Sequence, residues 1–190
     1  MNQSLPVLAA AITAAALPDA AFADLASNVG VVSDYRYRGI SQSRLEPALQ
    51  GGADYDNGGL YVGAWASTIK WITDAGTAGG FGAGNADVEL DIYGGYKAEL
   101  VKDSLAYDIG LLAYRYPGNK LTPRAETYEI YGALTRGPVT AKYSHSVGRL
   151  FGVAHSRNSG CLDVGAKFEF ASGLRAGRRG RENLLPRVHP

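Results

Sequence analysis

The chain has 190 residues, of which 46% are hydrophobic, and its formal net charge is +1. This length suggests one domain, and the near-zero charge gives no electrostatic reason to expect nucleic acid as a partner. The mean hydropathy of −0.12 excludes a bundle of membrane-spanning helices. It does not exclude a membrane β-barrel, because the strands of such a barrel are half polar.

Residues 1–23 have the features of a secretory signal peptide. An alanine-rich apolar run covers residues 5–17, and Ala21-Phe22-Ala23 fits the small-x-small cleavage pattern, so the mature chain is expected to begin at Asp24. No Lys or Arg precedes the apolar run, which leaves a misplaced start or a weak leader as alternatives. The run is too short to cross a bilayer as a helix.

Eight segments alternate between apolar and polar residues, as expected for strands with one apolar face. They are residues 27–38, 48–56, 60–68, 87–100, 105–116, 126–135, 139–147 and 161–170. The clearest is 87–100, in which one face carries Val88, Leu90, Ile92 and Tyr96 and the other carries Asp87, Glu89, Asp91 and Tyr93. The segment 60–68 is apolar on both faces, and we expect Trp65 and the nearby Trp71 at a membrane interface.

The connections between these segments alternate in length. Short polar turns lie near residues 56–59, 101–104 and 136–138, and longer connections lie near residues 41, 75, 121 and 151. The glycine-rich stretch 73–85 is expected to be a long surface loop. This alternation is typical of bacterial outer-membrane barrels, which have short periplasmic turns and longer external loops.

These patterns predict an all-β protein, an antiparallel up-and-down transmembrane β-barrel in residues 24–170 with about eight strands. After Phe170 the alternation stops, and residues 171–190 hold five arginines and one acidic residue. Outer-membrane barrels commonly end on an aromatic residue, whereas this chain ends Val-His-Pro. We therefore expect a truncated or frame-shifted end and an incomplete barrel, with a disordered basic tail as the alternative.

Charged residues on the polar face are expected to line the lumen, because Lys or Arg at the membrane midplane costs roughly 2–4 kcal/mol. The pore-lining candidates are Asp34, Arg36, Arg38, Asp87, Glu89, Asp91, Lys142, Asp163, Lys167 and Glu169. In an open lumen these charges would set ion selectivity. In a barrel of only eight strands they would pair and fill the lumen. The sequence leaves both possibilities open.

Residues with catalytic or metal-binding chemistry form no recognisable set. The single cysteine, Cys161, excludes an intrachain disulfide and a multi-cysteine metal site. No calcium-loop pattern surrounds the acidic residues of segment 87–100. Ser144 and His145 are neighbours on a strand and therefore point to opposite faces. We predict a protein that is not an enzyme, with no catalytic residue, no metal and no cofactor.

Several segments resemble the TorF family of bacterial porins. The longest reads SNVGVVSDYRYRGISQS at residues 27–43, and shorter ones lie at residues 47–52, 60–65, 89–96, 107–110, 116–118 and 128–132. The resemblance covers residues 27–170 and implies an outer-membrane β-barrel with a pore. It implies no catalytic residues, and members of that family usually continue through further strands.

The combined expectation is a porin of a Gram-negative cell outer membrane, through which small solutes or ions diffuse passively. Its expected partners are outer-membrane lipid and those solutes, without nucleic acid. One alternative is a plugged structural or adhesion barrel, which conductance measurements would separate from a porin. The other is a soluble periplasmic β-barrel that binds a ligand, which would remain in solution without detergent.

Overall fold

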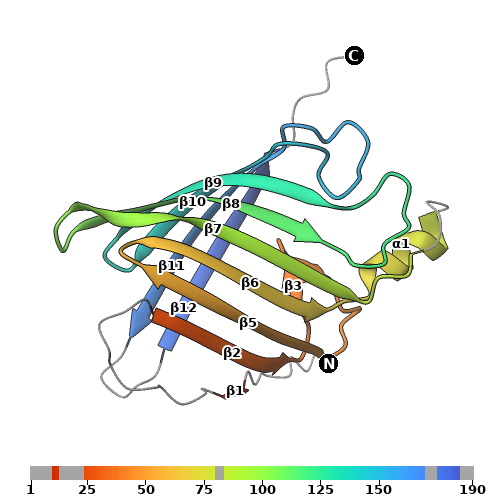
Figure 1. Cartoon of the computed structure of the whole chain (residues 1–190), viewed down its shortest axis with the longest axis horizontal. Coiled ribbons are helices and arrows are strands. Elements are labelled where there is room, and N and C mark those ends of the chain that lie inside the picture. Colours follow the sequence, from red (N-terminus) through yellow and green to blue (C-terminus); the bar gives the residue numbers. More distant parts are fainter. Residues whose placement is uncertain (1–9, 13–23, 80–83, 170–174, 185–190) are drawn as a thin grey trace, which may run out of the picture.

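The computed structural model describes residues 10–12, 24–79, 84–169 and 175–184. Its strands are β1 (Ala10–Ile12), β2 (Asp24–Val32), β3 (Arg36–Tyr37), β4 (Ile40–Ser41), β5 (Ala48–Asn57), β6 (Leu60–Thr68), β7 (Val88–Val101), β8 (Leu105–Arg115), β9 (Thr127–Arg136), β10 (Val139–Ser146), β11 (Gly160–Glu169) and β12 (Arg175–Leu184). One helix, α1 (Trp71–Gly79), lies between β6 and β7. Figure 1 shows these elements as one broad sheet with α1 at one end.

Ten of the strands form a single antiparallel sheet in the order β1-β2-β5-β6-β7-β8-β9-β10-β11-β12. The prediction of an all-β, up-and-down antiparallel arrangement is confirmed, since β2 and β5 to β11 correspond to the eight predicted segments. Their bounds agree with the prediction within one or two residues, except in the first segment. The predicted signal peptide, residues 1–23, lies outside the described residues apart from β1.

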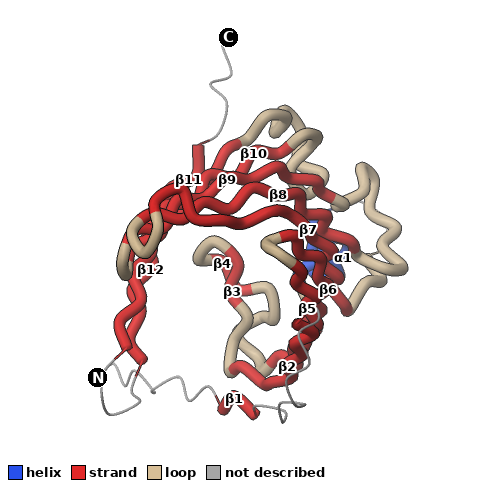
Figure 2. Tube along the Cα trace, turned by 60° about the vertical axis from the view of Figure 1, so that its left-hand side comes forward, coloured by secondary structure: helices blue, strands red, loops and turns tan. Residues whose placement is uncertain are grey.

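The sheet is strongly curved, and it does not close into a barrel within the described residues. Figure 2 shows the arc from β2 round to β12 with a space between these two ends. The free edge of β2 pairs with β1, from Ala10 opposite Val31 to Ile12 opposite Val29, and no pairing joins β12 to β1 or β2 in the described chain. The expected barrel, which the sequence suggested to be incomplete, is thus observed as an open antiparallel sheet within the described residues.

The first predicted strand, 27–38, is too long. β2 ends at Val32, and the chain then turns into a separate two-stranded hairpin made of β3 and β4. Arg38 and Gly39 form its turn with φ angles of 49° and 85°. Two successive residues with positive φ are typical of the tightest hairpin turns. The period-two pattern simply continues across this turn, which is why the sequence suggested one strand.

The helix α1 replaces part of the loop expected at residues 73–85. Trp71, Ile72 and Ala75 form its apolar side, and Ile72 is fully buried. This spacing of one and four residues places the three side chains on one face of a helix. No helix among the described residues is long and apolar enough to cross a bilayer.

The strand β12 occupies the region in which no strand was predicted. It pairs with β11 over its whole length, from Gly160 opposite Leu184 to Glu169 opposite Arg175. Its arginine-rich sequence has no apolar alternation, so the pattern that revealed the other strands was missing. The expected truncated or frame-shifted end refers to residues 171–190, which lie outside the described residues apart from β12.

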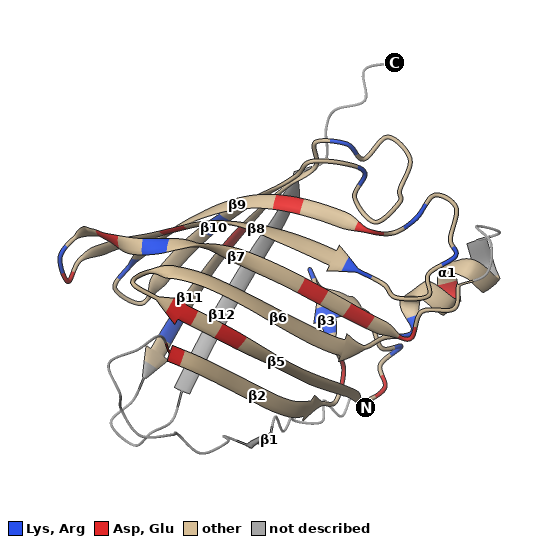
Figure 3. Cartoon of the chain, in the orientation of Figure 1, with Lys and Arg blue, Asp and Glu red and all other residues tan. Residues whose placement is uncertain are grey.

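The two faces of the sheet differ in chemistry. The convex face carries large apolar side chains that are between 41% and 76% exposed: Leu25, Val29, Val31, Leu49, Tyr55, Leu60, Val62, Val88, Ile92, Ile109, Leu111, Tyr128, Ile130, Leu134, Val139, Tyr143, Val164 and Phe168. The concave face carries most of the charged residues of the described strands, although Arg115 and Arg136 lie on the convex face. In Figure 3 the charged residues appear as short red and blue interruptions of the tan strands. The predicted facing of segment 87–100 is confirmed, because Ile92 is exposed and Glu89 is buried.

The buried apolar core lies at one end of the sheet. It consists of Ile69, Ile72, Ala86, Tyr114, Tyr116, Leu121 and Ala125, with Tyr35, Tyr37, Trp71 and Phe151 packed against them. These residues come from α1, from the long connections after β8 and β10, from the strand ends beside them, and from the segment with β3 (Figure 1). We call this the long-connection end. The opposite end carries the short turns at residues 58–59, 102–104 and 137–138.

Candidate functional site

Residues 33–47, which include β3 and β4, form an inner hairpin inside the curve of the sheet. Figure 2 shows β3 and β4 surrounded by the arc of the larger sheet. The carboxylate of Asp34 accepts hydrogen bonds from Arg36 at 2.5 Å and from Ser43 at 3.2 Å, and it also accepts one from Ser41. These contacts fold the segment back on itself and direct it away from the sheet edge.

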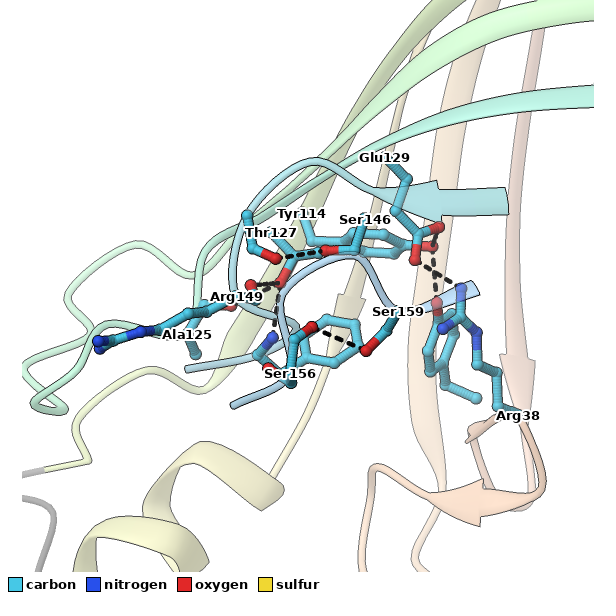
Figure 4. A network of polar contacts seen from close by, with 12 residues as sticks. Arg38, Tyr114, Ala125, Thr127, Glu129, Ser146, Arg149, Ser156 and Ser159 are labelled. Atoms are coloured by element: carbon cyan, nitrogen blue, oxygen red, sulfur yellow. Dashed lines mark hydrogen bonds and ion pairs between the residues drawn. The ribbon is translucent and has the colours of Figure 1, made fainter. Parts of the chain in front are cut away.

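An ion pair joins the inner hairpin to the sheet. Arg38 Nη2 donates to Glu129 Oε1 at 2.6 Å, and the side chains are only 9% and 2% exposed. Figure 4 shows Arg38 reaching Glu129 from the hairpin side. The Arg38 guanidinium also lies 4.8 Å from the ring centroid of Tyr37. Because both charges are shielded from water, each depends on the other for neutralisation.

A second contact uses the carboxylate of Glu89 in β7. Its Oε1 accepts a hydrogen bond from Tyr35 at 2.6 Å, and its Oε2 accepts one from Tyr116 at 3.0 Å. Burial, followed by the charge of Glu89, raises the pKa of Tyr35 well above the usual tyrosine range. A tyrosine is protonated at neutral pH even without this shift, so the Tyr35 hydroxyl is the donor to Glu89.

The long connection between β10 and β11 closes the same end of the concave face. Phe151 packs edge-on against Tyr37, Tyr114 and Trp71, with ring centroids 5.3–6.0 Å apart. Its backbone N–H donates to Thr127 Oγ1 at 2.8 Å. Figure 4 shows Thr127 together with the serines that hold this connection. The long-connection end is thus filled by aromatic side chains.

A cavity of about 620 Å³ lies between the inner hairpin and the sheet. Its walls are polar and aromatic, and the lining residues are Tyr35, Arg36, Tyr37, Asp54, Asp56, Tyr61, Trp65, Asp91, Tyr93, Lys97, Asp108, Leu112, Tyr131 and Lys142. They come from strands β5 to β10 and from the hairpin. The cavity is therefore a water-accessible part of the concave face.

Tyrosine–carboxylate pairs line this cavity. Tyr93 donates to Asp54 Oδ1 at 2.5 Å, and Tyr61 donates to Asp108 Oδ1 at 2.5 Å. Lys97 Nζ lies 2.5 Å from Asp56 Oδ2. Each of these contacts joins two strands that are separated by one strand in the sheet, β5 with β7 or β6 with β8, and so fixes the orientation of the charges across the wall.

Two further residues complete the wall. Lys142 Nζ lies 3.6 Å from the ring centroid of Tyr131, which is a cation–π geometry. Asp91 Oδ1 is buried and has no hydrogen-bond partner in the structure. The cavity therefore presents both signs of charge, and two of its acidic groups, Asp54 and Asp108, already accept hydrogen bonds from tyrosine hydroxyls.

Three glycines make room for the tyrosine rings of the wall. A Cβ atom at Gly63 would lie 2.5 Å from Tyr93, and one at Gly110 would lie 2.5 Å from the Tyr131 hydroxyl. A Cβ at Gly95 would lie 2.6 Å from the Tyr61 hydroxyl. The high glycine and tyrosine contents are thus partly explained, since each of these tyrosines occupies space that a side chain at the glycine would need.

The structure brings five of the predicted pore-lining residues to the inner site. Arg36, Asp91 and Lys142 line the cavity, while Arg38 and Glu89 bind the inner hairpin to the sheet. For Arg36 and Arg38 the predicted location on a wall strand is wrong, because both lie on the hairpin that follows β2.

The other five candidates lie elsewhere. Asp34 stabilises the inner hairpin, and Asp87 is exposed just before β7, 3.6 Å from Lys70. Asp163 is buried on β11, where its backbone position lies opposite that of Lys142 on β10. Lys167 is exposed near the short-turn end. Glu169 ends β11, and its side chain lies outside the described residues.

Five tyrosines contribute hydroxyl groups to the concave side: Tyr35, Tyr37, Tyr61, Tyr114 and Tyr116. A signal for Tyr61 was available in the sequence. The tight turn at Gly58-Gly59 pairs Asp56 with Tyr61 in register, and cross-strand partners share a face.

The two tryptophans are also on the inner side, contrary to the expected interface location. Trp65 packs against Tyr35 with ring centroids 5.4 Å apart, and Trp71 packs against Tyr116 at 5.1 Å. Among the described residues, no group of three or more His, Cys, Asp or Glu side chains is placed to hold a metal ion.

Comparison with known proteins identifies one family. A family model described as a bacterial protein of unknown function (Gcw_chp) matches residues 15–179. No curated protein and no solved structure matches the chain. The resemblance to the TorF porins is therefore wrong. Alternating tyrosine, glycine and acidic residues suit any strongly curved sheet with a polar interior, so those segments did not discriminate between families. The chain belongs to the bacterial Gcw_chp family, whose function is unknown.

Proposed function

We propose that this protein is a β-barrel protein of the bacterial outer membrane through which small solutes diffuse passively. The observation that carries the proposal is the division of the sheet into an apolar convex face and a polar concave face. Membrane barrels have this arrangement because lipid surrounds them and water fills their interior.

The convex face would be costly in water. Leu25, Leu60 and Leu111 are each more than 60% exposed, and burying one such side chain is worth about 1.5–3 kcal/mol. Soluble monomers rarely expose continuous apolar patches of more than a few hundred Å². Strands β2 and β5 to β11 all contribute to this face, so lipid is its most favourable surrounding.

Tyrosines near both ends of the convex face support the same proposal. Tyr96 and Tyr107 lie together at the short-turn end, with ring centroids 6.1 Å apart. Tyr128 lies at the long-connection end, where its hydroxyl accepts a hydrogen bond from Arg115 at 2.5 Å. Aromatic residues at these two levels are typical of the belts that flank the apolar band of a membrane barrel.

The cavity supports a passage for small solutes. Its volume of about 620 Å³ corresponds to roughly twenty water molecules in the liquid. The inner hairpin occupies the remaining interior, so only small solutes would pass beside it. The charges of Arg36, Asp91 and Lys142 would then bias which ions pass.

A plugged structural barrel is the second candidate, and a specific observation favours it. The inner hairpin is bound to the sheet by the buried Arg38–Glu129 pair, and aromatic side chains fill the long-connection end. If these contacts persist in the membrane, no continuous path would remain. Conductance distinguishes the two candidates.

The first experiment refolds the chain into detergent and then measures its solubility after the detergent is removed. A membrane protein should precipitate, and a folded barrel should migrate differently on gels when unheated and when boiled. Material that remains dissolved without detergent would contradict the proposal and favour a soluble periplasmic protein. Planar-bilayer recordings follow: steady single-channel steps support passive diffusion, and silent but inserted protein supports the plugged barrel.

A further inference from the structure

A second hollow lies on the convex side of the sheet, at the long-connection end. It has a volume of about 530 Å³ and is separate from the interior cavity. Its strand side is formed by Leu90, Ile92 and Ala113, and its outer rim includes Arg115, Asn119 and Arg124. We call this the rim groove.

The register of the sheet produces the two halves of the groove. Ile92 is opposite Ala113, and Leu90 is opposite Arg115, so an apolar strip runs along β7 and β8 to the strand end. The connection after β8, at residues 116–126, then contributes the remaining lining residues. The groove is therefore apolar toward the middle of the sheet and cationic toward its edge.

Asn119, one of the residues lining this groove, carries a buried side-chain donor without a partner. Its side chain is almost fully buried, at 4% exposure. Its Oδ1 accepts the Leu121 backbone N–H at 2.8 Å, so the amide cannot be turned round without losing this bond. Nδ2 has no hydrogen-bond partner. A buried donor left without a partner costs about 1–3 kcal/mol, and a ligand oxygen would recover this energy.

The charged side chains of the groove favour an anion. Arg115 donates one hydrogen bond to Tyr128, which leaves most of its five donors for other acceptors. Arg124 is exposed and lies 3.7 Å from Glu126. Two arginines and one glutamate make the groove positive by one charge. Arginine pairs bind phosphate well because the planar guanidinium donates two parallel hydrogen bonds.

We propose that the rim groove binds a phosphorylated lipid. The phosphate contacts Arg115, Arg124 and the Asn119 amide, and an acyl chain lies along Leu90 and Ile92. This inference rests on the proposed outer-membrane location, which places the strand end at the level of the lipid headgroups. The apolar strip favours a lipid over free phosphate, because phosphate alone would leave this half of the groove empty.

The test measures lipid binding to the full chain in non-ionic detergent by native mass spectrometry. The probes are dioctanoyl phosphatidic acid, dioctanoyl glycerol, which lacks the phosphate, and inorganic phosphate. Asn119→Asp keeps the acceptor for the Leu121 N–H and replaces the free donor with a negative oxygen. We expect this variant and the double variant Arg115→Gln/Arg124→Gln to lower phosphatidic acid affinity about tenfold or more. Arg136→Gln, at the short-turn end of the same face, is the matched control and should bind normally.

Three results would overturn the inference. Equal binding of dioctanoyl glycerol would mean that the phosphate is not recognised. Displacement of the lipid by equimolar inorganic phosphate would identify a free-anion site. An equal loss in Arg136→Gln would indicate non-specific attraction. The detergent requirement of the same samples separates the two proposals: a chain that needs detergent but shows no preference for phosphatidic acid contradicts only the rim-groove inference.

Discussion

The buried Arg38–Glu129 pair is expected to control whether the inner hairpin stays against the sheet. The proposed change is Glu129→Gln, which keeps the size of the side chain but removes its charge. The Arg38 guanidinium would then lie buried without a counter-charge, since both side chains are less than one-tenth exposed. Breaking a buried ion pair by removing one partner typically costs about 3–5 kcal/mol.

That cost sets the expected size of the effect. If the whole cost weakens the binding of the hairpin to the sheet, the fraction of molecules with a released hairpin rises roughly a hundredfold or more. The remaining contacts, from Tyr35 to Glu89 and from Tyr37 to Tyr114, oppose full release. The double variant Arg38→Met/Glu129→Gln removes both charges and should recover most of the lost stability, because no unpaired charge remains buried.

Hydrogen exchange of residues 33–47 in the refolded protein measures this effect directly. Glu129→Gln should speed exchange in the inner hairpin, while strands β5 to β8 stay protected. The control is Glu99→Gln, which changes an exposed carboxylate near the short-turn end. In bilayer recordings the released hairpin should give larger conductance steps. Unchanged hairpin protection in Glu129→Gln, or a double variant that is no more stable than the single one, would refute the reasoning.

Three further outcomes follow from the two faces of the sheet. Ile92→Asp should impair membrane integration more than Asp91→Asn, because only the first adds a charge to the convex face; equal losses in an insertion assay would undo the face assignment. Gly95→Val should prevent folding, since its Cβ would overlap a backbone carbonyl of the next strand and a tyrosine ring, whereas Gly132→Val, with its nearest neighbour 4.0 Å away, should fold. Tyr35→Phe should cost about 1–3 kcal/mol by leaving a buried carboxylate oxygen unpaired, and an unchanged urea midpoint would argue against that bond.

The period-two pattern predicted most of the sheet because it reflects a local property of strands. Each segment such as 105–116 carries its own alternation, and turns such as Gly58-Gly59 set the pairing of the strands on either side. The chemistry of the faces followed from the same pattern. The acidic side of segment 87–100 is indeed concave, and Ile92 is indeed exposed on the convex side.

The pattern failed where the backbone turned without interrupting it. Tyr35 and Tyr37 continue the alternation of β2 but lie on the inner hairpin, beyond the end of that strand at Val32. The helix α1 was missed because glycines at 76 and 79 suggested a loop, whereas packing of Trp71 and Ile72 against the core stabilises the helix. Propensity is a weak prior, and tertiary contacts overrode it here.

The amino-acid sequence alone determined the all-β class, the order of eight strands and the polarity of each face, since these depend on neighbours along the chain. Only the tertiary structure decided that the hairpin of residues 33–47 folds inward, that Arg38 meets Glu129, and that Tyr35, Tyr37 and Tyr61 line one cavity. Those contacts join residues as much as 91 positions apart. They arise from the curvature of the sheet, which brings distant strands round a common space, and no local pattern records that curvature.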